Sequence, residues 1–166
     1  MEYWPLELAK IKPSSQKLKG QVAVITGGLG GIGYISAKKF KKEGAEVVII
    51  DIVNPKNIKL NISGMTYFQC DITKEKNLKG IFDKISEKYG GVDILISNAG
   101  FATVESLENL SKNQLDKSLD LNLFAHHYFV KHGVAIMKRQ KTRGVVLFNI
   151  SKQAVNPGKN YAAYGL

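Results

Sequence analysis

The chain has 166 residues, of which 44% are hydrophobic, and its formal net charge is +10. This length suits one domain with a substantial core, and no apolar run approaches the ~20 residues of a membrane span. No short apolar core follows a basic start, so we expect no secretory signal. The single cysteine, Cys70, cannot form an internal disulfide. These features predict a cytoplasmic protein in which Cys70 is a small buried thiol.

The positive charge comes mostly from lysines that we expect on solvated helix faces. Two basic runs lack the interleaved aromatic residues of a base-stacking surface: Lys38, Lys39, Lys41 and Lys42, and then Lys138, Arg139, Lys141 and Arg143. We therefore expect no nucleic-acid partner, and nucleic-acid binding through the net charge is the weakest alternative. The overall positive field still attracts anionic ligands.

Residues 1–20 form a lead-in segment, and one domain follows over residues 21–166. The lead-in contains an apolar stretch whose tryptophan, Trp4, we expect to anchor it to the domain. From Gln21 onward, strand and helix patterns alternate. We expect strands at 22–26, 46–51, 65–70, 92–97 and 144–150, and helices at 32–43, 74–89 and 112–138. This alternation predicts an α/β fold, with a parallel sheet between helices on both faces.

The helix expected at 112–138 is one long element. Its pattern places Leu115, Leu119, Leu123 and His126 along one side. His126, His127 and His132 all lie on this helix, and their spacing sets up neither a catalytic triad nor a metal site with other ligands. We interpret the three histidines as packing or surface groups and expect no metal.

The first strand runs into five glycines within seven positions, Gly27 to Gly33, and a helix pattern follows at once. Glycines in such a turn let the backbone approach a phosphate, and the amino end of the next helix attracts an anion. Two registers fit. Gly28, Gly30 and Gly33 match a G-x-G-x-x-G pattern, whereas Thr26 with Gly27, Gly31 and Gly33 matches T-G-x-x-x-G-x-G. Either register predicts a dinucleotide site.

Three polar groups follow further strands, at the edge where ligands of parallel sheets bind. Asp51 ends the second strand, 18 residues after Gly33. An acid there can accept both hydroxyls of the adenosine ribose and repel a 2′-phosphate, which favours NAD over NADP. Asp71 follows the third strand and Asn98 the fourth. Turn or cap chemistry is the alternative for all three.

The full set of motifs resembles the short-chain dehydrogenase/reductase family. The resemblance rests on the glycine turn, Asp71, Asn98-Ala99-Gly100, Asn122, Asn149-Ile150-Ser151 and Tyr164, in that order over residues 21–166. It implies a three-layer Rossmann fold with strand order 3-2-1-4-5 and without the family's last strands. It also implies an NAD-dependent oxidoreductase with a small-molecule substrate. Whether the chain forms a homo-oligomer stays open, because the family's usual dimer helices include one that would follow Tyr164.

The resemblance carries the family's roles to individual residues. Asn122 positions a water, Ser151 orients the substrate oxygen, and Tyr164 exchanges a proton with that oxygen. The implied cofactor-binding residues are Gly27, Leu29, Gly30, Gly31, Ile32, Gly33, Asp51, Ile52, Asp71, Ile72, Asn98, Ala99 and Gly100.

A narrower resemblance covers the lead-in and residues 151–158. These stretches are similar to the dehydrogenase half of bifunctional rhamnulose-phosphate aldolase/alcohol dehydrogenase proteins. The aldolase half has no counterpart in the sequence. This resemblance implies a small alcohol, aldehyde or sugar-derived substrate.

Two positions stay open at this stage. Aligned on Asn149-Ile150, the catalytic serine falls at Lys152, whereas the spacing of 13 residues before Tyr164 gives Ser151, which we favour. Tyr161 is an alternative to Tyr164 as the base.

The family's Tyr-x-x-x-Lys motif would place its lysine at position 168, after Leu166. Two interpretations follow: a dehydrogenase, or a truncated dinucleotide-binding module that is catalytically inert. In either case the fifth strand would present a bare apolar edge.

Overall fold

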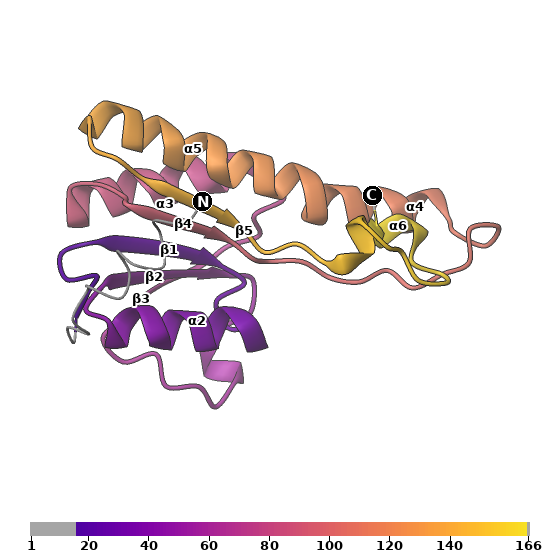
Figure 1. The fold of residues 1–166 in the computed structure, drawn as a ribbon, viewed down its shortest axis with the longest axis horizontal. Coiled ribbons are helices and arrows are strands. Elements are labelled where there is room, and N and C mark those ends of the chain that lie inside the picture. The colour runs from indigo at the N-terminus through magenta and orange to yellow at the C-terminus, as the bar shows by residue number, and fades with distance from the viewer. Residues whose placement is uncertain (1–15, 166) are drawn as a thin grey trace, which may run out of the picture.

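The computed structural model describes residues 16–165, and these fold around a five-stranded parallel sheet with the order β3-β2-β1-β4-β5 (Figure 1). The predicted α/β fold and strand order are confirmed. The bounds of the strands are β1 Val22–Thr26, β2 Glu46–Asp51, β3 Thr66–Gln69, β4 Ile94–Ser97 and β5 Val145–Phe148. The expected anchoring role of Trp4 lies outside the described residues.

Helices cover both faces of the sheet (Figure 1). Helix α2 lies on one face, and helices α3 and α5 lie on the other. Their bounds are α2 Gly31–Lys42, α3 Glu75–Tyr89, α4 Lys112–Leu119, α5 Ala125–Gln140 and α6 Ala162–Gly165, with 3-10 turns at Pro55–Asn57 and Lys152–Ala154. Helix α3 ends because Gly90 adopts a left-handed conformation, with φ of 80°.

The central strand β1 is buried along its whole length, and alternate side chains enter two different cores. Val22 and Val24 join the core under α3 and α5. Ala23 and Ile25 join the core under α2. A strand buried on both faces reads as a continuous apolar run, and this is why Val22–Thr26 lacks any polar alternation.

The long helix expected at 112–138 is interrupted by a π-helical turn, Asp120–Phe124, between α4 and α5. A π-turn adds one residue to a helical turn, so the buried face changes its register there. Leu123, within the π-turn, is 50% exposed, whereas Ala125 and Phe129 after it are fully buried.

Strand β5 lies at one edge of the sheet and carries exposed apolar side chains. Val145 is 59% exposed and Leu147 is 51% exposed. The predicted apolar edge is therefore present in the folded chain. Within residues 16–165, none of the helices is both long and apolar enough to cross a membrane.

Candidate dinucleotide site

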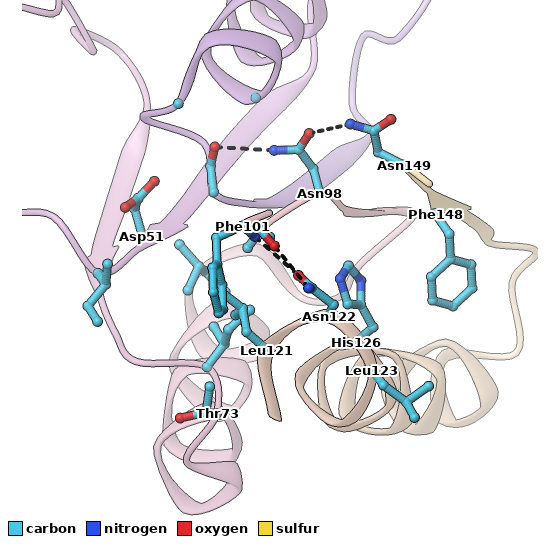
Figure 2. A pocket seen from close by; sticks show the side chains of 18 of the residues that line it. Asp51, Thr73, Asn98, Phe101, Leu121, Asn122, Leu123, His126, Phe148 and Asn149 are labelled. Atoms are coloured by element: carbon cyan, nitrogen blue, oxygen red, sulfur yellow. Dashed lines mark hydrogen bonds between the residues drawn. The ribbon is translucent and has the colours of Figure 1, made fainter. Parts of the chain in front are cut away.

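An open groove of about 1820 Å³ runs along the carboxyl ends of the strands. Figure 2 shows side chains from several elements pointing into it. Every residue to which the sequence assigned a catalytic or cofactor-binding role lines this one groove: Gly27, Leu29, Gly30, Gly31, Ile32, Gly33, Asp51, Ile52, Asp71, Ile72, Asn98, Ala99, Gly100, Asn122, Ser151 and Tyr164. The fold thus brings them together, and their individual roles stay predictions.

The glycine turn after β1 leaves no room for a Cβ at Gly27, Gly28 or Gly33. Gly27 has a φ of +62°, and a Cβ there would lie 2.8 Å from the Cα of Ala99. A Cβ on Gly33 would overlap the carbonyl oxygen of Gly27 and lie 2.8 Å from the Nδ2 of Asn98. Among the turn's glycines, Gly27 alone has a positive φ; that freedom is not used at Gly28 or Gly30. A Cβ on Gly28 would lie 2.6 Å from the Cγ2 of Ile49, and a Cβ on Gly31 would meet nothing within 4 Å, so both registers stay compatible with the turn.

The amino end of α2 opens onto the groove without a cap from a side chain. Its N-cap residue is Gly30, and within the described residues the helix has no side-chain cap and no acidic group in its first turn. The first N–H groups of a helix lack partners within it and carry its positive dipole end. This helix end can therefore receive an anion such as a pyrophosphate.

Asp51 closes β2 beside the glycine turn, and the residue is 8% exposed. Its Oδ2 accepts a hydrogen bond from the backbone N–H of Leu29 at 2.9 Å. Its Oδ1 accepts another from the N–H of Val53 at 3.0 Å. A carboxylate has about four acceptor positions, so about two remain for a ligand. Asp51 can hold the turn and bind two hydroxyls at once.

Asn98 connects three strand ends through its side-chain amide. Its Nδ2 donates to the carbonyl oxygens of Thr26 at 3.0 Å and Gly27 at 3.2 Å. Its Oδ1 accepts from the Nδ2 of Asn149 at 2.9 Å (Figure 2). The hydroxyl of Thr26 accepts in turn from the N–H groups of Asn98 and Ala99. The ends of β1, β4 and β5 therefore form one rigid floor of the groove.

Asp71 makes the turn after β3 as well as lining the groove. Its Oδ1 accepts from both the N–H and the hydroxyl of Thr73, at 3.0 and 2.7 Å. The turn chemistry weighed for this residue is therefore present. Cys70, next to it, is 5% exposed, as expected. Burial, with a smaller contribution from Asp71, raises the pKa of the Cys70 thiol to about 11, so it is not a nucleophile at neutral pH.

Asn122 lies in the π-turn, and its side chain forms hydrogen bonds with the loop after β4. Its Oδ1 accepts from the N–H of Phe101 at 3.1 Å, and its Nδ2 donates to the carbonyl oxygen of Phe101 at 3.0 Å (Figure 2). These two bonds occupy the side-chain oxygen and one of the two amide hydrogens. The side chain of Asn122 thus fixes the groove wall formed by residues 100–101.

His126 is a groove residue that the sequence did not single out for the site. Its Nδ1 lies 2.6 Å from the Oγ of Ser97, which is fully buried at the end of β4. Its ring faces that of Phe148, with centroids 6.2 Å apart (Figure 2). Burial lowers the pKa of His126, with the Ala99 carbonyl acting in the opposite direction. The sequence signal that could have identified His126 is its position one helical turn after Asn122, which places both side chains on the same side of the helix.

The alternatives for the serine and the tyrosine differ in where they lie. Ser151 and Tyr164 line the groove, and neither Lys152 nor Tyr161 is among its lining residues. The Oγ of Ser151 accepts from the N–H of Gln153 at 3.3 Å, which caps a short 3-10 turn. The ring of Tyr164 lies 6.2 Å from that of Tyr161, centroid to centroid.

No group of three or more His, Cys, Asp or Glu side chains suited to a metal ion occurs among the described residues. The site consists of backbone N–H groups, carboxylates, amides and hydroxyls around an apolar groove. Such a donor and acceptor set suits an anionic ligand with ribose hydroxyls.

Known proteins resemble this chain in both sequence and fold. A protein from Bacillus subtilis (strain 168) named uncharacterized oxidoreductase YuxG is 34% identical, over 99% of this chain and 25% of its own length. The structure of Thermoplasma acidophilum aldohexose dehydrogenase has 29% identity and a TM-score of 0.82, covering 92% of this chain and 57% of that one. The 3-ketoacyl-(acyl-carrier-protein) reductase from Brucella melitensis, complexed with NADH, has 28% identity and a TM-score of 0.81, with coverages of 90% and 64%.

This chain thus spans a quarter of the Bacillus relative and about three fifths of the two solved structures. The model of the family described as short chain dehydrogenase matches residues 21–165, nearly the whole described domain. The chain belongs to the short-chain dehydrogenase family of oxidoreductases.

Proposed function

We propose that the groove binds NAD and serves an oxidoreductase that acts on a small alcohol, aldehyde or sugar-derived substrate. The observation that carries this proposal is the position of Asp51. Its buried carboxylate keeps free acceptor positions at the end of β2 and lies against the glycine turn. A negative charge there favours a ribose with two hydroxyls and disfavours a 2′-phosphate.

The residues present fit NAD along the whole groove. The turn at Gly27–Gly33 has no room for side chains at Gly27 and Gly33, and the uncapped amino end of α2 would receive the pyrophosphate. Asp51 would hold the ribose, and Asp71 and Ile72 would flank the adenine. The reductase from Brucella melitensis, similar in fold and sequence, was solved with NADH, which supports the choice of cofactor.

Oxidation of an alcohol requires one proton acceptor beside the substrate oxygen. When bound, NAD would accept a hydride from the alcohol carbon. Tyr164, as its phenolate, would take the hydroxyl proton and become the phenol, and Ser151 would donate a hydrogen bond to the same substrate oxygen. The lining of the groove supports Tyr164 over Tyr161 and Ser151 over Lys152. A general base of this kind contributes about 10²–10⁴-fold in rate.

The substrate class rests on the narrower resemblance found in the sequence. The Bacillus oxidoreductase matches 99% of this chain and hence the lead-in before residue 21, whereas the family model starts at residue 21. The apolar side chains of Phe148 and Ile150 line the groove beside Ser151 and favour a small substrate with an apolar end. L-lactaldehyde and propane-1,2-diol fit this description.

A steady-state assay of NAD reduction with propane-1,2-diol, and of NADH oxidation with L-lactaldehyde, tests the proposal. We expect turnover that Tyr164→Phe lowers by at least about 100-fold. Tyr161→Phe is the matched control and should retain activity, because its ring does not line the groove. NAD binding without turnover of either substrate would instead support the inert dinucleotide-binding module.

A further inference from the structure

Ser118, in the last turn of α4, has a fully buried hydroxyl that joins two other segments of the chain. Its Oγ donates to the carbonyl oxygen of Ala163 at 2.6 Å. The same Oγ accepts from the Nδ2 of Asn122 at 3.1 Å. Serine within a helix more often faces solvent or bonds back to its own helix, so a bond to residue 163 is a specific tie.

This hydroxyl completes a line of hydrogen bonds across the substrate end of the groove. The line starts at the backbone of Phe101 in the loop after β4 and passes through the amide of Asn122. It continues through Ser118 to the carbonyl of Ala163, the residue before Tyr164. These hydrogen bonds therefore link the loop that follows Asn98-Ala99-Gly100 to the backbone that carries Tyr164, the proposed base.

The segment around Tyr164 depends on such ties because its own helix is short. Helix α6 covers only Ala162–Gly165, and a helix of this length does not hold itself together in water. A second tie joins the N–H of Glu105 to the carbonyl of Asn160 at 2.9 Å, at the start of the segment. The hydrogen bond from Ser118 lies closer to Tyr164, because it is made to the peptide unit between Ala163 and Tyr164.

We propose that Ser118 is a positioning residue that sets the place of Tyr164 relative to Asn122 and the loop after β4. This inference rests on the proposed function, because it gives Tyr164 its importance. A displacement of about 1 Å at a reacting group can cost about 100-fold in rate. A single buried hydroxyl that fixes the backbone beside the base is therefore a determinant of its reach.

Amide hydrogen exchange tests the tie without requiring turnover. The N–H groups of Tyr164 and Gly165 both donate to the carbonyl of Tyr161, so their exchange reports on α6. Loss of a hydrogen bond worth about 1 kcal/mol corresponds to a roughly fivefold to tenfold change in an opening equilibrium. We expect Ser118→Ala to accelerate exchange at these two amides by that factor, with β1 and β4 unchanged.

Ser118→Thr is the matched control, because it keeps the hydroxyl at the same position. We expect its exchange at Tyr164 and Gly165 to be slower than in Ser118→Ala. Unchanged exchange in Ser118→Ala, acceleration spread evenly over β1 and β4, or equal exchange in both variants would each overturn the proposal. A chain without dehydrogenase activity would count against the proposed function and leave the exchange result valid. Where turnover is measured, Ser118→Ala should lower kcat with NAD affinity unchanged.

Discussion

The carboxylate of Asp51 accepts a hydrogen bond from the backbone N–H of Leu29 at 2.9 Å, across 22 residues of sequence. The acid at the end of β2 thereby holds the glycine turn after β1 in place. Because acceptor positions remain on the same carboxylate, one residue both shapes the groove and can recognise a ribose. Loss of Asp51 should therefore affect the turn and the choice of dinucleotide together.

Asp51→Asn separates the charge of this side chain from its shape. We expect NAD affinity to fall about tenfold or more, because hydrogen bonds to a charged acceptor contribute about 1.5–3 kcal/mol. NADP affinity should fall less or rise, since the repulsion of its 2′-phosphate is removed. Calorimetric titration with both dinucleotides measures this, and Asp51→Ala should show the same order. Equal losses for NAD and NADP would count against the role given to Asp51.

Gly33→Ala should damage the fold, whereas Gly31→Ala should not. A Cβ at position 33 would overlap the Gly27 carbonyl oxygen, and no heavy atom lies within 4 Å of a Cβ placed at position 31. Overpacking against rigid backbone costs about 1–3 kcal/mol or more. Thermal unfolding of the two variants gives the comparison. The same melting temperature for both variants would show that a Cβ is accommodated at position 33, contrary to this prediction.

Thr26→Val should destabilise the chain more than Thr26→Ser. The Oγ1 of Thr26 is fully buried and accepts from the N–H groups of Asn98 at 2.9 Å and Ala99 at 3.1 Å. Valine has a similar shape without the acceptor, and an unsatisfied buried donor costs about 1–3 kcal/mol. Urea unfolding measures both variants. A larger loss in the serine variant would mean that the methyl group, and not the hydroxyl, holds this floor.

His126 should make stability fall as the pH drops below about 6.5, the usual pKa of histidine. Burial lowers the pKa of His126 in the folded chain, so below 6.5 the unfolded chain binds the proton more readily than the folded one. Glu75, whose pKa is lowered chiefly by its hydrogen bond from Lys131, contributes a further loss of stability only below about pH 4.5. Unfolding free energies between pH 7.5 and 5 should therefore decline in the native chain.

The matched variant for this pH dependence is His126→Gln, which keeps a polar group opposite Ser97 and removes the titration. Its stability should vary less between pH 7.5 and 5 than that of the native chain. An identical slope in the two proteins would assign the pH dependence to other groups.

The sequence predicted the elements that depend on local patterns and chain order. The alternation of apolar strands with helix patterns is local, so the sheet and its polar strand ends followed from it. Gly27 and Gly33 were recognisable because the turn between β1 and α2 is short. The strand order came from the resemblance, since alternation alone leaves several orders open.

Contacts that join distant parts of the chain could not be predicted from local sequence patterns. Ser97 and His126 are 29 residues apart, and Ser118 and Ala163 are 45 apart. Their pairing depends on how α4 and α5 lie on the sheet, which includes the π-turn at Asp120–Phe124. Leu123 within that turn and His126 just after it both line the groove.

A calorimetric titration of the native chain with NAD and NADP tests most directly whether this groove selects NAD. We predict saturable binding of NAD at one site, with NADP binding at least about tenfold more weakly because of the Asp51 charge. The Asp51→Asn chain, titrated in parallel, should lose most of that difference. No saturable binding of NAD, or tighter binding of NADP, would contradict the selection of NAD by this groove.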